Sequence, residues 1–364
     1  MAGHCSTPMS STGPTDINRS SIFRAATRDR TGRPRSGRRC SSTAATTRQS
    51  LPRADQPVRT VQRGEGSPVA LTPAARLRQH LQSRKLVVAP SCPDPFFARI
   101  AQDAGFAAVA LGGYAMGAQT GITEPLLTMS EVVEASRRMV GALDIPVIVD
   151  GGAGFGDPLH TMRTIRELEQ VGVAAVHVED QVFPKRAHYH RQYQEHVIPA
   201  EEMALKIAYA VEARRNPDFV IIARTDAMQT DGYDEAVRRA RLYAEAGADM
   251  VMLFPNNDAE ARQAPRDCGV PLVYVNSTGN RAARPIYGIA DLQAMGYAAC
   301  VDAISVAITG YTAVRDLLGR LRDTGRVGID PAQAHAARLE IERLIGLETY
   351  YQIEEKTVER AASA

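Results

Sequence analysis

The sequence predicts an α/β protein that folds as a (β/α)8 TIM barrel with extra C-terminal helices and a disordered N-terminal extension. One observation is a repeated unit, from Leu86 onward, of a short apolar run, a polar or Gly-rich loop and an amphipathic helix. A second is that the apolar runs number eight. A third is that the runs are continuously apolar, which is typical of parallel strands covered on both faces. Eight units favour a closed barrel over an open doubly wound sheet.

The predicted strands are rich in Val, Ile, Leu and Ala, as buried parallel strands are. In chain order the runs are LVVAPS from Leu86, AVALGG from Ala108, PVIVDG from Pro146, AVHVED from Ala175, VIIARTD from Val220, MVMLFP from Met250, LVYVN from Leu272 and CVDAIS from Cys300.

Helical patterns separate these runs, and several end in Gly just before the next strand. The clearest are SEVVEASRRMVGAL, HTMRTIRELEQVG, PAEEMALKIAYAVEARR and DEAVRRARLYAEAG. After the eighth unit, PAQAHAARLEIERLIGLETYYQIEEKTVERAA predicts one or two further amphipathic helices. The Gly-rich stretch DGGAGFGD does not open a helix after the first strand, which disfavours a dinucleotide site.

The first 67 residues are rich in Arg, Ser, Thr and Pro and have almost no apolar periodicity. Such a segment cannot bury enough surface to offset its ordering entropy. A transit-like tail and a basic nucleic-acid arm are alternatives, but a disordered extension without a catalytic part fits best. We therefore expect a disordered segment over 1–67, the barrel over 68–325 and C-terminal helices over 326–364.

Composition limits the partners and the compartment. The formal net charge is +2 and the positive excess lies in the first 67 residues, so neither nucleic acid nor membrane is expected as a partner. No run approaches the eighteen apolar residues of a membrane span. The five cysteines are scattered and form no CxxC pair, which favours a reducing, cytoplasmic location.

Polar residues follow five of the predicted strands. In a barrel, the C-terminal strand ends and the loops after them converge on one pocket. The residues are Asp150, Glu179, Asp180, Arg224, Asp226, Asn256 and Asn276.

Two of these acids predict a metal site. Asp150 and Glu179 end adjacent strands, which places their carboxylates a short distance apart. Two carboxylates at such a distance repel each other unless a cation lies between them. A site with a few oxygen ligands and room for water suits Mg2+, and Mn2+ is a possible alternative. Arg224 offers a planar fork that suits a substrate carboxylate or phosphonate.

Structural roles compete with these interpretations. Asp157 and Asp180 are expected to cap helices, and His177 is expected to be a hydrogen-bonded core histidine rather than a ligand. Arg224 could be a counter-ion for Asp226. His188 and His190 form half of a zinc motif, but no third ligand at suitable spacing is apparent. Convergence from five strands favours a functional pocket all the same.

Between about Leu77 and Glu359 the chain resembles the isocitrate lyase and phosphoenolpyruvate mutase superfamily. The matching stretches are DAGFAAVALGGYAMGAQTG, PVIVDGGAGFGDP, VHVEDQVFPKR, EEMALKIAYAVEAR, FVIIARTDA and DEAVRRARLYAEAGAD. The resemblance implies a Mg2+-dependent barrel that cleaves or forms C–C or P–C bonds next to a 2-oxo acid, through a metal-bound pyruvate-type enolate. It also implies a homo-oligomer, a dimer or tetramer in which a C-terminal helix is exchanged.

The resemblance assigns roles by position. Asp150 and Glu179 match the metal-site acids, and Glu124 matches an outer-shell carboxylate. Arg224 matches the substrate clamp. Gly112 and Gly113 match the backbone cradle that receives the oxo-acid carboxylate, and Lys185 and Arg186 match the basic start of a loop that closes over the substrate. Tyr114, Asn256 and Asn276 are further residues expected to bind substrate.

Five positions depart from the family pattern. Lyases of the family carry Lys-Arg-Cys-Gly-His in the closing loop, with Cys as the proton donor, where this chain continues Ala187-His188-Tyr189-His190. The candidate replacement donors are therefore His188, His190 and Tyr189, and histidine titrates nearest neutral pH. The other departures are Val109, Leu111, Gly152 and Asn256.

These residues predict a lyase that cleaves a C–C bond of a small 2-oxo or 2-hydroxy dicarboxylate. The cleavage is a retro-aldol or retro-Claisen reaction or a decarboxylation. A P–C mutase or hydrolase acting on phosphonopyruvate or carboxyphosphonoenolpyruvate is one alternative. A barrel that binds an oxo acid without turning it over is another.

Overall fold

The computed structural model describes residues 71–187, 196–280 and 283–358. The chain divides between Ser67 and Pro68, and all of these residues lie in the second unit, Pro68–Ala364. The leader expected over residues 1–67 lies outside them, and the domain boundaries stay a prediction. Among the described helices, not one combines the length and apolar character that a bilayer span requires.

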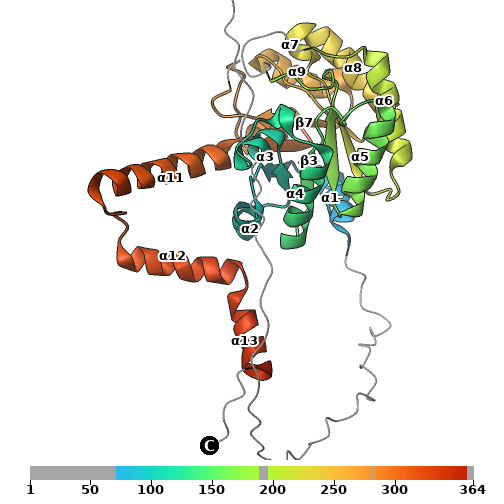
Figure 1. The fold of residues 1–364 in the computed structure, drawn as a ribbon. Helices are drawn as coiled ribbons and strands as arrows, with labels where there is room; N and C mark the ends of the chain where they lie inside the picture. The colour runs from blue at the N-terminus through green and yellow to red at the C-terminus, as the bar shows by residue number, and fades with distance from the viewer. Residues whose placement is uncertain (1–70, 188–195, 281–282, 359–364) are drawn as a thin grey trace, which may run out of the picture. The chain divides into compact units, whose positions relative to one another are not determined.

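Eight parallel strands form the barrel, as predicted, and the flanking helices surround it (Figure 1). The strands are β1 Val87–Pro90, β2 Val109–Leu111, β3 Val147–Asp150, β4 Ala175–Glu179, β5 Val220–Arg224, β6 Met250–Met252, β7 Leu272–Asn276 and β8 Ala299–Asp302. Each strand from β2 to β8 pairs with the next, and β8 pairs with β1. A single parallel bridge between Ser91 and Ala110 joins β1 to β2 and closes the ring.

The helices follow the strands in the predicted alternation. Their bounds are α1 Pro73–Gln82, α2 Pro95–Asp103, α3 Gly113–Gln119, the 3-10 helix η1 Glu124–Leu126, α4 Met129–Ala142, α5 Pro158–Gln170, α6 Ala200–Ala213, α7 Ala227–Thr230, α8 Tyr233–Glu245, α9 Asp258–Cys268, α10 Ile289–Met295, α11 Ser305–Thr324, α12 Pro331–Leu344 and α13 Leu347–Thr357. The C-terminal segment thus forms two helices, because Gly346 adopts a left-handed conformation between them.

The strands are buried on both faces, and their side chains alternate between two cores. The inner core lies inside the barrel and holds residues such as Val87, Ala89 and Ile148. The outer core lies between strands and helices and holds residues such as Leu111 and Tyr274. Successive side chains along a strand point to opposite faces of the sheet. Every second residue of a strand therefore faces the inside of the barrel, and only such residues reach its mouth.

One of the two predicted helix caps is confirmed and the other is wrong. Asp157 caps α5, where its side chain accepts hydrogen bonds from the N–H groups of Leu159 and His160. Asp180 caps no helix. It is buried and accepts hydrogen bonds from Arg239 and Tyr243 of α8, because the residue after Glu179 faces the outer core.

Candidate active site

Asp150, Glu179 and Glu124 bring three carboxylates together at the barrel mouth. One oxygen from each side chain lies within 4.8 Å of the others. Asp150 and Glu179 come from the inner faces of β3 and β4, and Glu124 opens η1 after α3. Three acids packed this closely repel one another unless positive charge lies among them, so the cluster could hold a metal ion.

The backbone fixes Asp150. Its Oδ2 accepts a hydrogen bond from the N–H of Gly113 at 3.0 Å, and its Oδ1 accepts one from Gly152 at 2.9 Å. A Cβ added to Gly113 would come within 2.6 Å of Glu124 and 2.9 Å of Asp150. Glycine at 113 is therefore required for these two carboxylates to approach each other.

Lys185 extends its ammonium group into the carboxylate cluster. Its Nζ contacts Glu124 and lies 2.9 Å from Oε1 of Glu179. Its side chain is 6% exposed. The ammonium supplies the positive charge that the three carboxylates need in this structure.

Arg224 joins the cluster from β5. Its guanidinium contacts Glu179 at 3.0 Å and Asp226 at 3.0 Å, so the expected ion pair with Asp226 is present and a second one accompanies it. The guanidinium also lies over the ring of Phe254, 4.8 Å from the ring centroid. These three contacts fix the orientation of the guanidinium fork at the barrel mouth.

The buried charges alter one another's pKa values. Burial acts to raise the pKa of Asp150, but His177, Lys185 and Arg224 hold it well below its ordinary value. Burial raises the pKa of Glu179. Burial also opposes the charge of Lys185, yet Glu179 and Glu124 raise its pKa, so the ammonium stays protonated.

His177 lies inside the barrel, as expected, but within the described part of the chain its Nδ1 lacks the hydrogen bond expected of a core histidine. Its Nδ1 is 3.6 Å from Oδ1 of Asp150, too far for a hydrogen bond, and this buried nitrogen has no hydrogen-bond partner among the described residues. Burial lowers the pKa of His177. The ring lies beside Asp150 without a hydrogen bond to it.

A small cavity adjoins the carboxylates. Its polar end is formed by Glu124, Asp150 and Lys185, and its volume is about 30 Å3, which is room for about one water molecule. The apolar part of its wall comes from Met116, Pro125, Leu127, Val132, Phe155 and Phe183. The ammonium of Lys185 thus takes up the polar end of this cavity, next to Glu124 and Asp150.

Other predicted site residues lie further from the cluster. Asn276 donates to the carbonyl of Tyr287 and accepts from its N–H, and thereby ties down the loop after β7. Asn256 accepts a hydrogen bond from Gln229. Tyr114 is half exposed and Arg186 is exposed. The substrate-binding assignments of both asparagines stay predictions.

The candidate proton donors His188, Tyr189 and His190 lie outside the described residues, as does the zinc half-site. Sequence reasoning also missed two residues of the barrel mouth, Ser91 and Phe254. Alternation from the inner-core residues of β1 and β6 was the signal that could have found them.

Buried carboxylates, a fixed arginine and a lysine at the C-terminal end of a (β/α)8 barrel are the arrangement expected of an enzyme active site in this fold class. The family model described as "Phosphoenolpyruvate phosphomutase" matches residues 77–322. The chain belongs to this family, within the phosphoenolpyruvate mutase and isocitrate lyase superfamily.

Curated relatives include both lyases and a mutase. The chain is 35% identical over 286 residues to 2,3-dimethylmalate lyase of Eubacterium barkeri, covering 77% of this chain and 96% of that protein. It is 37% identical over 265 residues to a probable 2-methylisocitrate lyase of Corynebacterium glutamicum, covering 70% and 84%. It is 32% identical over 297 residues to a carboxyvinyl-carboxyphosphonate phosphorylmutase of Arabidopsis thaliana, covering 78% and 86%.

Solved structures agree with this grouping. A crystal structure of 2,3-dimethylmalate lyase matches with a TM-score of 0.73 at 29% identity, covering 81% of this chain and 98% of that one. The structure of oxaloacetate acetylhydrolase with the inhibitor 3,3-difluorooxalacetate matches with a TM-score of 0.72 at 27% identity, covering 78% of this chain and 97% of that one. The structure of phosphonopyruvate hydrolase with oxalate and Mg2+ matches with a TM-score of 0.70 at 29% identity, covering 79% of this chain and 100% of that one.

Proposed function

We propose that this protein is a Mg2+-dependent lyase that cleaves a C–C bond of a small 2-oxo or 2-hydroxy dicarboxylate. The single observation that carries the proposal is the cluster of Glu124, Asp150 and Glu179 beside the guanidinium of Arg224. A cation held by the acids and an arginine beside them suit a substrate with a carboxylate next to an oxo or hydroxy group.

The donor set fits a hard divalent cation. The candidate ligands are all carboxylate oxygens, which Mg2+ and Mn2+ prefer over nitrogen and sulfur. The ammonium of Lys185 already lies among them and satisfies the same need for positive charge. A bound Mg2+ would polarise the oxo group and offset the negative charge that develops on its oxygen.

The chain's own residues would hold the substrate and keep water away. Arg224, fixed by Asp226 and Phe254, would bind a carboxylate through its fork. Phe155 and Phe183, from the loops after β3 and β4, meet edge to face with ring centroids 6.5 Å apart and line the cavity. They would shield a reactive enolate from water.

The closing loop would supply the proton. When Lys185 leaves the carboxylates, its charge can follow the substrate's distal carboxylate, and Arg186 lies next to it in the chain. We assign the proton donor to His188, which comes directly after the position where lyases of the family carry Cys. His190 and Tyr189 are the alternative donors.

The test is a substrate screen with the full-length protein and Mg2+. Oxaloacetate, alkylmalates, methylisocitrate and phosphonopyruvate would be supplied separately, and 2-oxo acid release would be followed with a coupled dehydrogenase. The proposal predicts release from a C–C substrate and its loss in EDTA. Turnover that EDTA leaves unchanged would contradict it.

P–C bond chemistry is the second candidate function. It is favoured by Ala187, which stands where lyases of the family carry the Cys donor. The phosphorylmutase relative supports the same alternative. Turnover of phosphonopyruvate alone in the same screen would decide for it.

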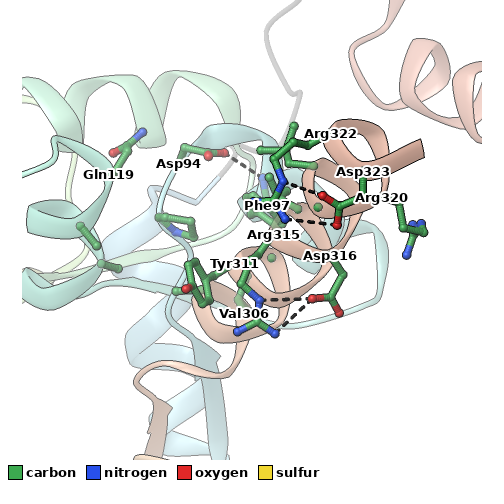
Figure 2. Close-up of a pocket in the computed structure, with 18 residues that line it drawn as sticks. Asp94, Phe97, Gln119, Val306, Tyr311, Arg315, Asp316, Arg320, Arg322 and Asp323 are labelled. Carbon is green, nitrogen blue, oxygen red and sulfur yellow. Dashed lines mark hydrogen bonds and ion pairs between the residues drawn. The ribbon is translucent and has the colours of Figure 1, made fainter. Parts of the chain in front are cut away.

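We also propose that the protein is a homo-oligomer, because α11 carries an uncovered apolar face. None of its twenty residues is buried, and Tyr311, Val314 and Leu318 are more than half exposed. With α2 and α3 the helix lines a groove of about 1410 Å3 (Figure 2). A surface of this kind usually marks an interaction site, and α11 of a second copy would fill the groove.

We place the protein in the cytoplasm. The three cysteines in the described part of the chain, Cys92, Cys268 and Cys300, are buried free thiols. Burial raises the pKa of each of them, so they remain protonated and unreactive. This usage suits a reducing compartment.

A further inference from the structure

Ser91 follows β1 at the point where the barrel closes. Its N–H donates to the carbonyl of Asp302 at 2.8 Å, and it bridges to Ala110 of β2. The next residue, Cys92, donates its N–H to the carbonyl of Ala110 at 3.0 Å. Neighbours on both sides therefore fix the backbone of Ser91.

The side chain of Ser91 faces the inside of the barrel. Val87 and Ala89 belong to the inner core, and alternation puts Ser91 on the same face, one layer nearer the mouth. The residue is 1% exposed. Its hydroxyl oxygen accepts a hydrogen bond from the N–H of Gly112 at 3.2 Å.

The two N–H groups of the glycine pair are both occupied by side chains of the protein. Gly112 donates to Ser91, and Gly113 donates to Oδ2 of Asp150. A Cβ on Gly112 would lie 2.9 Å from Oγ of Ser91, so this oxygen lies directly against the α-carbon of Gly112. A substrate carboxylate cannot take either N–H while these bonds hold, although the sequence assigns it to this pair.

The hydroxyl of Ser91 still has a proton to donate. A serine hydroxyl carries one donor besides its acceptor lone pairs, and no described residue accepts a hydrogen bond from this one. The bond received from Gly112 polarises the O–H group and makes it a stronger donor. Ser91 therefore offers a buried donor beside the glycine pair, whose second member contacts Asp150.

We propose that the hydroxyl of Ser91 donates a hydrogen bond to the carboxylate of the 2-oxo acid, in the place expected for the N–H of Gly112. Gly112 then acts through Ser91 and positions it. The inference rests on the proposed function, because it places the oxo acid beside Asp150. It makes Ser91 a substrate-binding residue that the family comparison does not supply.

Oxalate, a planar mimic of the pyruvate enolate, is the probe. Its affinity for the full-length protein in MgCl2 would be measured by calorimetry for wild type, Ser91→Ala and Ser91→Cys. Cysteine keeps the shape of the side chain but is a weak donor. The matched control is Ser136→Ala, which removes another buried hydroxyl, one that donates to the carbonyl of Val132 in α4 at 2.7 Å.

Both Ser91 variants should bind oxalate roughly 10- to 100-fold more weakly, the usual loss for a hydrogen bond to a charged group. KM for the substrate should rise more than kcat falls. Ser136→Ala should bind oxalate like wild type. Wild-type affinity in both Ser91 variants would overturn the inference and leave the proposed function standing.

The two hypotheses can fail separately. Wild-type protein that binds oxalate but turns over nothing in the screen would contradict the lyase proposal, and the Ser91 variants would still decide the binding role. Wild-type protein that binds no oxalate and turns over no substrate would overturn both.

Discussion

At the scale of single residues, the chemistry depends most on Asp150. The backbone N–H groups of Gly113 and Gly152 hold the Asp150 carboxylate in place. No flexible side chain is needed to position it. His177, Lys185 and Arg224 hold the pKa of Asp150 low, so its carboxylate stays ionised despite burial. A carboxylate that is both fixed and charged is what a divalent cation requires.

Asp150→Asn keeps the shape of this side chain and removes its charge. We expect turnover with Mg2+ to fall by more than the roughly 10- to 100-fold that loss of an outer-shell partner costs. The control is Asp157→Ala in the loop after the same strand, which should melt at a lower temperature because it loses its helix cap and should keep full activity. Steady-state kinetics and thermal melts give both readouts.

The proton donor is tested by His188→Gln, with His190→Gln as its companion. Loss of the general acid should slow the chemical step by roughly two to four orders of magnitude and leave substrate binding nearly unchanged. Single-turnover kinetics separate the two effects. Near-normal rates in both variants would leave Tyr189, or a water molecule, as the donor.

At the scale of elements, the start of the loop after β4 places the Lys185 ammonium in the carboxylate site. Lys185 lies among carboxylates that a metal would also need, so the ammonium and the cation compete for one position. The cavity beside it has room for about one water. We therefore expect Lys185 to leave this position when a substrate enters.

Lys185→Gln removes the competing charge. We expect tighter Mn2+ binding, measured by calorimetry or by the Mn2+ resonance signal, together with lower turnover. Lys85→Gln removes the same charge from an exposed residue before β1, at the other end of the barrel, and should change neither. Weaker Mn2+ binding in Lys185→Gln would show that the lysine does not compete with the metal.

The elements were predictable from sequence, and several side-chain positions were not. Continuous apolar runs located all eight strands to within a few residues, because periodicity is a local property. Asp180 and Asn276 face away from the mouth, since Glu179 and Val275 occupy the inward positions. The partners of Asp180 on α8 lie about sixty residues away, and no local pattern shows such contacts.

The carboxylate pair was predictable because a parallel barrel aligns its strand ends. The insertion of Lys185 was not, because it depends on how the loop after β4 folds. Ser91 was missed for another reason. Its side chain matters only because the barrel closes at the bridge to Ala110, and closure is a property of the whole sheet.

At the scale of the whole molecule, polar contacts join α12 to α2. Arg343 of α12 pairs with Asp103 at the end of α2 at 2.7 Å, and Arg99 donates to the carbonyl of Leu344. The apolar stripe of α11 remains uncovered by the described residues of its own chain. Assembly would complete this part of the structure.

Leu318→Asp places a charge in that stripe. We expect the particle mass measured by light scattering to fall toward that of a monomer, because the buried charge would lack a partner. Leu205→Asp, at a comparably exposed leucine of α6, is the matched control and should leave the mass unchanged. A wild-type protein that is already monomeric would contradict the oligomer proposal.

The proposed reaction requires the carboxylate site to form an enolate of a 2-oxo acid. The most direct measurement is exchange of the methyl protons of pyruvate in D2O, followed by NMR with the wild-type protein and Mg2+. We expect exchange that stops in EDTA and in Asp150→Asn. Tight binding of pyruvate without exchange, or exchange that persists in EDTA, would contradict it and leave a barrel that only binds the acid or one that acts by other chemistry.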